Sequence, residues 1–153
     1  MKRNIKIIVE YDGTNYGGWQ RQKNSPSIQE ELEKGLFKLT GKKILVQGAG
    51  RTDSGVHARG QVANFFTDSL IPPHRFSLAL NAVLPRDIRV VESREVEADF
   101  HARFCAKARH YRYSMFIGPS GPAIGRHYYY HIPVQLDLEA MKKAVELFKG
   151  THD

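Results

Sequence analysis

Two hydrophobic periodicities alternate along the amino-terminal part of the chain. Apolar residues occupy every second position of Ile5–Tyr11, which predicts a strand with one buried face. Over Ile28–Leu39 they recur at spacings of three and four residues, which predicts a helix with one apolar face. Ser27 and Glu30 form a capping box at the start of this helix, each side chain expected to bond the other residue's backbone N–H, and Gly41 is expected to end it.

The same reasoning predicts the next four elements. Short strands are expected at residues 43–47 and 61–67. Pro72-Pro73 opens a second helix, which stops before Pro85, and a further strand covers residues 88–96. The order β-α-β-β-α-β is that of the ferredoxin-like unit, an α+β fold in which helices back an antiparallel sheet.

The carboxy-terminal part adds further elements to this unit. A long alternating strand is expected at residues 109–117 and a short one at residues 128–131, with a turn-rich loop between them. Asp137 is expected to cap a last helix with one apolar face, and Gly150 to end it. The predicted fold is therefore a ferredoxin-like or RRM-like unit followed by an extra strand pair and a carboxy-terminal helix.

Composition narrows the possible partners. The 153 residues are 41% hydrophobic and 25% charged, as in ordinary globular proteins, and the formal net charge of +7 favours a polyanionic partner. No apolar stretch approaches the roughly 18 residues of a membrane span, and no signal peptide is expected, so we predict no membrane partner. The single cysteine, Cys105, fits the reducing cytoplasm and is expected to be a half-buried packing residue. The seven histidines lack paired ligand spacing, so no metal is predicted.

The most informative segment is Gly48–Val62, GAGRTDSGVHARGQV. Its four glycines allow unusual backbone angles and close approach to a ligand. One carboxylate, Asp53, lies near the cationic or titratable residues Arg51, His57 and Arg59. An Asx turn without catalytic function is the alternative for so short a pattern. The glycine spacing matches neither a dinucleotide-binding fingerprint nor a phosphate-binding P-loop.

Two other segments carry RNA-binding chemistry. Tyr11–Gln22, YDGTNYGGWQRQ, combines aromatic rings, amides and an arginine, although Trp19 itself is expected in the core. In Asp99–Tyr113, DFHARFCAKARHYRY, basic residues interleave with aromatic ones. That pattern is typical of surfaces that neutralise phosphates and stack on bases, although an ordinary exposed edge strand has a similar composition.

In this order, the three segments closely resemble the tRNA pseudouridine synthase A family. The resemblance implies a pseudouridine synthase fold, tRNA as substrate and no cofactor. Within tRNA it implies uridines 38, 39 and 40 of the anticodon arm, and it implies a homodimer for the complete protein. Residues 1–104 would form the catalytic half, and residues 105–153 would begin a second half. The ending at Lys149–Asp153 resembles the start of a segment leading into further sequence, so we expect an amino-terminal fragment that is inactive alone.

The resemblance also assigns roles to residues. Asp53 would be the nucleophile, in a pocket and held ionised by Arg51, attacking either C6 of the uracil or C1′ of the ribose. Arg51 would also fill the gap left by the flipped uridine, and Tyr111 would pack on the target uracil. Further RNA contacts are expected from Arg21, His57, Arg59, Arg103, Arg109 and Arg112.

Two other functions share the predicted order of elements. A non-catalytic RRM-like RNA-binding module would need exposed aromatic residues on its two central strands, and the RNP1 pattern is missing at residues 61–66. A ferredoxin-like regulatory domain would leave the basic and aromatic segment unexplained.

Overall fold

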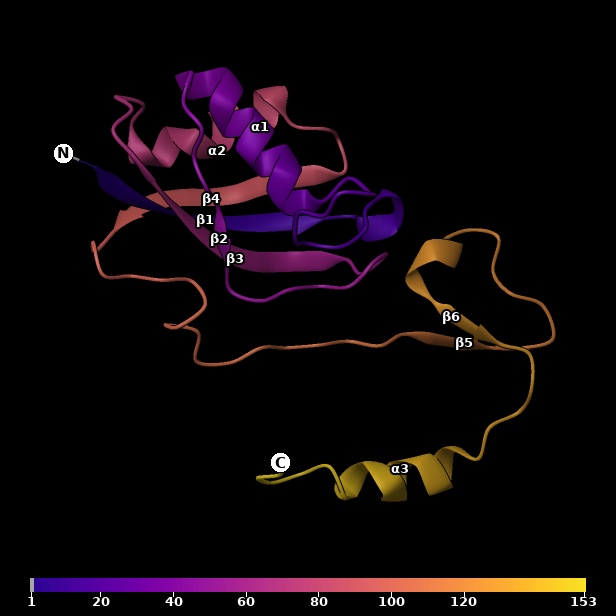
Figure 1. Ribbon diagram of the computed structural model, residues 1–153. Coiled ribbons are helices and arrows are strands. Elements are labelled where there is room, and N and C mark those ends of the chain that lie inside the picture. The colour runs from indigo at the N-terminus through magenta and orange to yellow at the C-terminus, as the bar shows by residue number, and fades with distance from the viewer. Residues whose placement is uncertain (1) are drawn as a thin grey trace. The chain divides into compact units, whose positions relative to one another are not determined.

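The computed structural model describes residues 2–153, which form two compact units (Figure 1). The first unit ends at Arg109, and the second runs from His110 to Asp153. Each unit contains its own sheet, of four strands in the first and two in the second. The proposed functional division between residues 104 and 105 stays a prediction.

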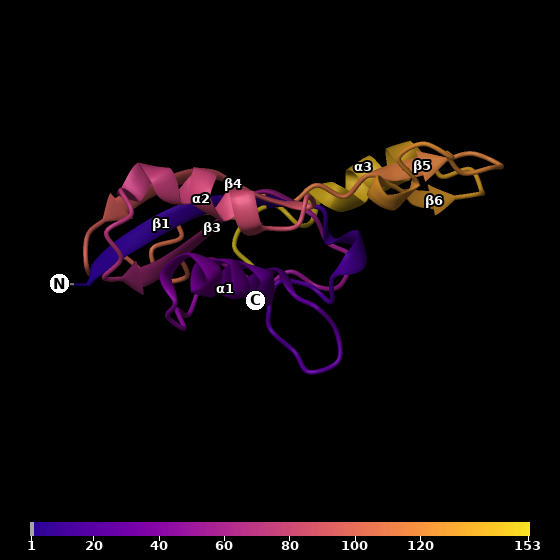
Figure 2. The ribbon, with the colours of Figure 1, turned by 90° about the horizontal axis from the view of Figure 1, so that it is seen from above.

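The first unit is an antiparallel sheet with both of its helices on one face (Figures 1 and 2). The sheet order β2-β3-β1-β4 and the chain order β-α-β-β-α-β confirm the predicted fold. Its elements are β1 (Arg3–Tyr11), α1 (Ile28–Thr40), β2 (Gln47–Gly48), β3 (Ala58–Thr67), α2 (Phe76–Val83) and β4 (Ile88–Val96).

Helix α1 forms as its sequence predicts, with one difference at the cap. Ser27 Oγ accepts a hydrogen bond from Glu30 N at 3.2 Å, and Gly41 ends the helix with a left-handed φ of 68°. The Glu30 carboxylate turns instead to Lys34, 3.1 Å away on the next turn. One half of the capping box is therefore present, and an i,i+4 ion pair takes the place of the other half.

The core lies between the helices and one face of the sheet. The alternating residues Ile5, Ile7 and Val9 of β1 are completely buried against the apolar stripe of α1. Phe65 of β3 and Phe76 of α2 meet edge to face, with 5.3 Å between ring centroids. The core therefore joins elements far apart in the sequence and fixes the ends of the strands, where the loops begin.

Strand β2 is shorter than the predicted strand at residues 43–47. Only Gln47 and Gly48 pair with β3. Side chains of α1 satisfy the backbone just before them: Glu33 Oε1 accepts from Val46 N at 3.1 Å, and Gln29 Nε2 donates to Val46 O at 3.0 Å. These bonds replace the pairing that a longer strand would make.

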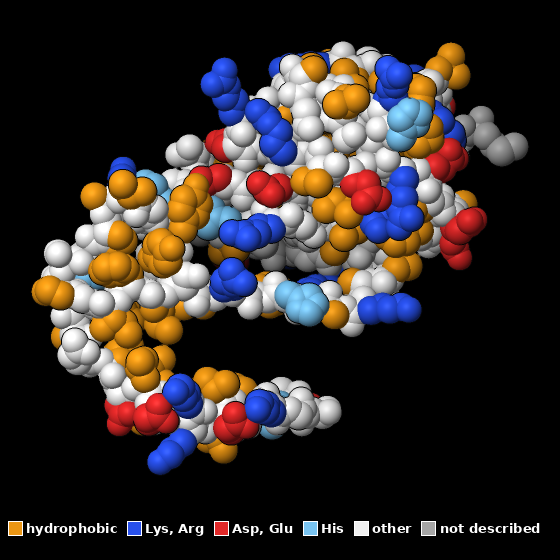
Figure 3. Space-filling model, turned by 180° about the vertical axis from the view of Figure 1, so that it is seen from behind, with side chains coloured by type: hydrophobic (Ala, Val, Ile, Leu, Met, Phe, Trp, Pro, Cys, Tyr) orange, Lys and Arg blue, Asp and Glu red, His pale blue; other side chains and the backbone are white. Residues whose placement is uncertain are grey.

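The second unit contains the parallel strands β5 (Met115–Ile117) and β6 (Tyr130–Ile132), followed by α3 (Leu138–Glu146). The predicted long strand at residues 109–117 is thus reduced to its last three residues, because only these find a pairing partner. Asp137 caps α3, accepting from Ala140 N at 2.9 Å, as predicted. All residues from 110 to 153 are described and none is buried; hydrophobic side chains lie open on the surface of this unit (Figure 3).

Cys105 is exposed, so the expectation of a half-buried packing residue is wrong. It lies in a surface turn in which its backbone N donates to His101 O at 2.9 Å, and its Sγ accepts from His101 N at 3.4 Å. This local pairing holds the thiol beside its own turn and away from the core. No helix among the described residues is long and apolar enough to cross a membrane.

Candidate active site

The loop that carries Asp53 is fastened to the loop that follows β1. Tyr11, at the end of β1, places its hydroxyl 2.8 Å from Thr52 Oγ1. Trp19 N donates to Thr52 O at 3.0 Å. Two of the three segments identified in the sequence, Tyr11–Gln22 and Gly48–Val62, therefore meet directly next to Asp53.

Two glycines allow this close approach. A Cβ on Gly13 would lie 2.0 Å from Val56 O, and one on Gly18 would lie 2.3 Å from Thr52 O. Gly18 also has a φ of +103°, which residues with a side chain rarely adopt. Any side chain at either position would push the Asp53 loop away from its support.

Trp19 is buried, which confirms its predicted place in the core. A Cβ on Gly48 would lie 2.5 Å from its indole ring, so the ring packs directly on the backbone where the Asp53 segment begins. Part of the segment Tyr11–Gln22, which was predicted to contact RNA, therefore supports the loop that carries Asp53.

Asp53 itself is exposed, and its carboxylate has no hydrogen bond or ion pair within residues 2–153. Arg51 is also exposed, and no ion pair between the two is found in the same range. The described residues therefore leave the carboxylate open to solvent, and the expected pairing with Arg51 is not formed among them. Because Thr52 turns its side chain inward to Tyr11, its two neighbours face solvent.

His57 holds the far end of the loop. Gly13 N donates to His57 Nδ1 at 3.0 Å, and Asp12 Oδ1 lies 3.0 Å from the same nitrogen. His57 thus contacts the backbone of the first loop, and its expected RNA contact stays a prediction.

The third segment reaches the start of the Asp53 loop through Arg109, whose guanidinium donates to Ala49 O at 2.8 Å. Upstream, a buried amide pair anchors the same segment to the sheet. Asn64 Nδ2 donates to Asn4 Oδ1 at 2.9 Å, and Asn64 Oδ1 accepts from Ala102 N at 2.9 Å. The carboxy-terminal end of the first unit is thereby attached to the open face of its sheet.

The other predicted RNA contacts differ in their surroundings. Arg21 forms an ion pair with Glu33, a largely buried carboxylate, while Arg59 is exposed. The guanidinium of Arg103 lies 5.8 Å from the centroid of its neighbour's ring, Phe104. In the second unit, the predicted RNA contact Arg112 and the predicted uracil-packing ring of Tyr111 are both exposed. Their roles stay predictions.

The sequence did not single out Tyr16, which supports the loop from its other end. Its backbone O accepts from Gly55 N and from Ser54 Oγ, both at 3.3 Å. Its hydroxyl donates to Asp87 Oδ1 at 2.7 Å. Burial, with a contribution from the Asp87 carboxylate, raises the pKa of the Tyr16 hydroxyl well above its usual value. Only the tyrosine-rich composition of its segment hinted at a special position.

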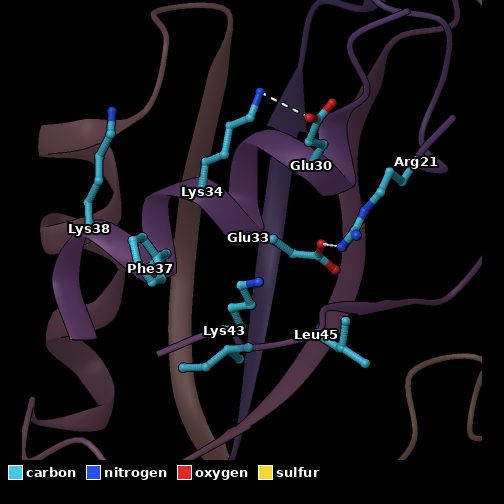
Figure 4. A pocket seen from close by; sticks show the side chains of 9 residues that line it. Arg21, Glu30, Glu33, Lys34, Phe37, Lys38, Lys43 and Leu45 are labelled. Carbon is cyan, nitrogen blue, oxygen red and sulfur yellow. Dashed lines mark hydrogen bonds and ion pairs between the residues drawn. The ribbon is translucent and has the colours of Figure 1, made fainter. Parts of the chain in front are cut away.

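A cavity of about 470 Å³ lies elsewhere, between α1 and residues 43–45 (Figure 4). Phe37 and Leu45 line it, and Lys43 lies beside them. Asp53 is not among its lining residues. Within residues 2–153, no group of three His, Cys, Asp or Glu side chains is placed to hold a metal ion.

Residues 7–105 match the family model described as tRNA pseudouridine synthase. The chain belongs to this family. The match contains the Asp53 loop and both loops that support it, and it ends inside the basic and aromatic segment. The family assignment and the fold thus rest on the first unit.

Curated relatives extend the likeness over nearly the whole chain. The protein named tRNA pseudouridine synthase A of Acetivibrio thermocellus is 54% identical over 151 residues, which are 99% of this chain and 62% of the relative. The proteins of the same name from Clostridium kluyveri and Caldicellulosiruptor saccharolyticus are each 49% identical, with the same coverage. The chain therefore spans about 62% of the length of the relatives that it matches.

Proposed function

We propose that this chain provides the catalytic aspartate of an enzyme that isomerises uridine to pseudouridine in tRNA. The observation that carries the proposal is the Asp53 loop. Its backbone is fixed by hydrogen bonds on both sides of Asp53, while the carboxylate faces solvent without a partner in the described residues. A preorganised nucleophile is expected to combine a fixed backbone with a reactive side chain that is accessible to the substrate.

The reaction breaks the N1–C1′ bond of uridine and forms a C5–C1′ bond; C5 loses its proton to solvent, and N1 gains one. The product is an isomer of the substrate, so the atoms balance without a co-substrate. Asp53 attacks C6 or C1′ to form a covalent intermediate, which splits one difficult rearrangement into two easier steps.

We propose uridines 38, 39 and 40 of the anticodon arm as the sites, on the basis of the resemblance described above. The formal charge of +7 supports a polyanionic substrate. Arg51 and Arg59 are exposed on either side of Asp53 and can reach a bound phosphate or the gap in a base stack. Tyr111 is proposed to pack on the flipped uracil.

A passive RRM-like module is less well supported. Such a module stacks bases on aromatic residues of its two central strands, which here are β3 and β1. On the face of β1 away from the helices, the chain presents Lys6, Ile8 and Glu10, none of which is aromatic. The open face of the sheet therefore lacks half of the required stacking platform.

The test replaces the matching 151 residues of the Acetivibrio thermocellus relative with this chain. This chimera should release tritium from tRNA labelled at C5 of uridine. Asp53→Asn should lower the rate at least about a thousandfold, because the nucleophile is lost, while tRNA binding remains. The matched control is Asp68→Asn, which changes an exposed carboxylate paired with Lys42 at 2.6 Å. Normal turnover by the Asp53→Asn chimera would disprove the assignment.

Two further proposals concern the complete protein. We propose that it is a homodimer, which light scattering of the chimera can measure, and that it works in the cytoplasm. The single cysteine of this chain supports a reducing compartment.

A further inference from the structure

We infer that Thr52 is the positioning residue of Asp53 and that the Tyr11 hydroxyl and the Trp19 amide set its place. This inference rests on the proposed function, because it concerns the geometry of the proposed nucleophile. It adds two residues, Tyr11 and Thr52, whose roles the family match does not specify.

The first step is the rigidity of Tyr11. It is the last residue of β1 and is paired on both sides, with Ala58 of β3 and Ile88 of β4. Its side chain is 2% exposed, and its ring lies 6.0 Å from that of Trp19. A hydroxyl on a buried ring at the end of a central strand has little freedom to move.

The second step is the double attachment of Thr52. Its side chain meets the Tyr11 hydroxyl at 2.8 Å, and its carbonyl accepts from Trp19 N at 3.0 Å. The side chain of Thr52 is thus bonded to β1, and its carbonyl is bonded to the loop that follows β1. Because Asp53 follows directly, the orientation of its Cα–Cβ bond depends on these two bonds.

The third step is the support behind Asp53. Val56 N donates to Asp53 O at 3.2 Å, which closes the turn. Gly55 N donates to the Tyr16 carbonyl, and the Tyr16 hydroxyl is bonded to Asp87 directly before β4. The turn is therefore held to the sheet at both ends, and Thr52 is the attached residue that directly precedes Asp53.

Removal of that bond should affect catalysis without affecting tRNA binding. Tyr11 is buried and Thr52 is half-buried, so neither presents much surface to a tRNA. A looser Thr52 leaves the Asp53 carboxylate in place on average but spreads its orientations. Loss of alignment lowers kcat while KM for tRNA stays constant.

The experiment measures kcat and KM of the chimera with Tyr11→Phe, with Thr52→Val, and with both changes. Each single change should lower kcat about tenfold at unchanged KM, and the double variant should be no slower than the slower single one. Thr52→Ser keeps the hydroxyl and should restore most of the rate. The control for loss of a hydroxyl is Ser93→Ala, which removes the acceptor of the 2.9 Å bond from Ser77 N and should leave kcat unchanged.

The possible outcomes separate this inference from the proposed function. If the unaltered chimera forms pseudouridine but Tyr11→Phe and Thr52→Val keep its kcat, this inference alone is wrong. Multiplicative effects in the double variant, or a rise in KM in place of a fall in kcat, would also overturn it. If Thr52→Ser is as slow as Thr52→Val, the hydroxyl is not the positioning group. A chimera without any synthase activity overturns both proposals.

Discussion

Gly13 offers a direct way to move the Asp53 loop without touching any polar side chain. The change is Gly13→Ala, which adds one methyl group. The new Cβ would lie 2.0 Å from Val56 O, whereas real Cβ atoms essentially never approach another heavy atom within 3.0 Å. Because the neighbour is backbone and not the end of a flexible side chain, the loop has to move by about 1 Å to relieve the contact.

A displacement of this size has a large expected effect on the rate. A misplacement of about 1 Å can cost about a hundredfold in catalysis, so kcat of the chimera should fall by about that factor. Crowding at the loop should also lower the free energy of unfolding by about 1–3 kcal/mol. The loss of rate and the loss of stability are therefore both expected, and a control has to separate them.

Gly41→Ala is that control. Gly41 has a φ of +68°, and a Cβ there would meet nothing within 4 Å. The change should cost about 1–2 kcal/mol of backbone strain at the end of α1, far along the chain from the Asp53 loop. Both variants should have a lowered Tm in thermal unfolding, but only Gly13→Ala should lose tritium release from tRNA.

The assigned role of Gly13 would be refuted if Gly13→Ala kept kcat within about threefold of the chimera. It would equally be refuted if the two variants lost activity in parallel with their loss of stability, because the effect would then come from unfolding and not from the position of the loop.

Two further predictions concern the chain alone. Truncation after Arg109 should leave the thermal unfolding of the first unit unchanged within about 2 °C, because no residue from 110 to 153 is buried; a large fall in Tm would contradict this. The raised pKa of Tyr16 implies stability that is fully present below the ordinary tyrosine value of 10.0 and is lost as the pH rises above it, because the unfolded chain ionises first. Urea midpoints should therefore fall more steeply between pH 9 and 11 for the unaltered chain than for Tyr16→Phe, and equal slopes would argue against the burial of this hydroxyl.

Elements with local signals could be predicted from the amino-acid sequence. The alternation of Ile5–Tyr11 and the apolar stripe of α1 each need only neighbouring residues to be recognised, and both elements formed where expected. Ser27 and Gly41 marked the ends of α1 for the same reason, because caps act within one turn of a helix. The three family segments were also visible in the sequence, since their residue types carry the resemblance.

The contacts of those segments depend on how the chain folds and could not be predicted from their residues. Val46, directly before β2, does not pair in the sheet, because Glu33 and Gln29 of α1 bind its backbone groups. Asp53 faces solvent because Thr52, and not Asp53, turns toward Tyr11, a partner 41 residues away in the chain. Periodicity and spacing indicate which side of a helix or strand is apolar. They contain no information on which distant hydroxyl or carbonyl group will form a hydrogen bond with a given residue. The support of the proposed nucleophile is made of such distant contacts, and it therefore became visible only in the folded chain.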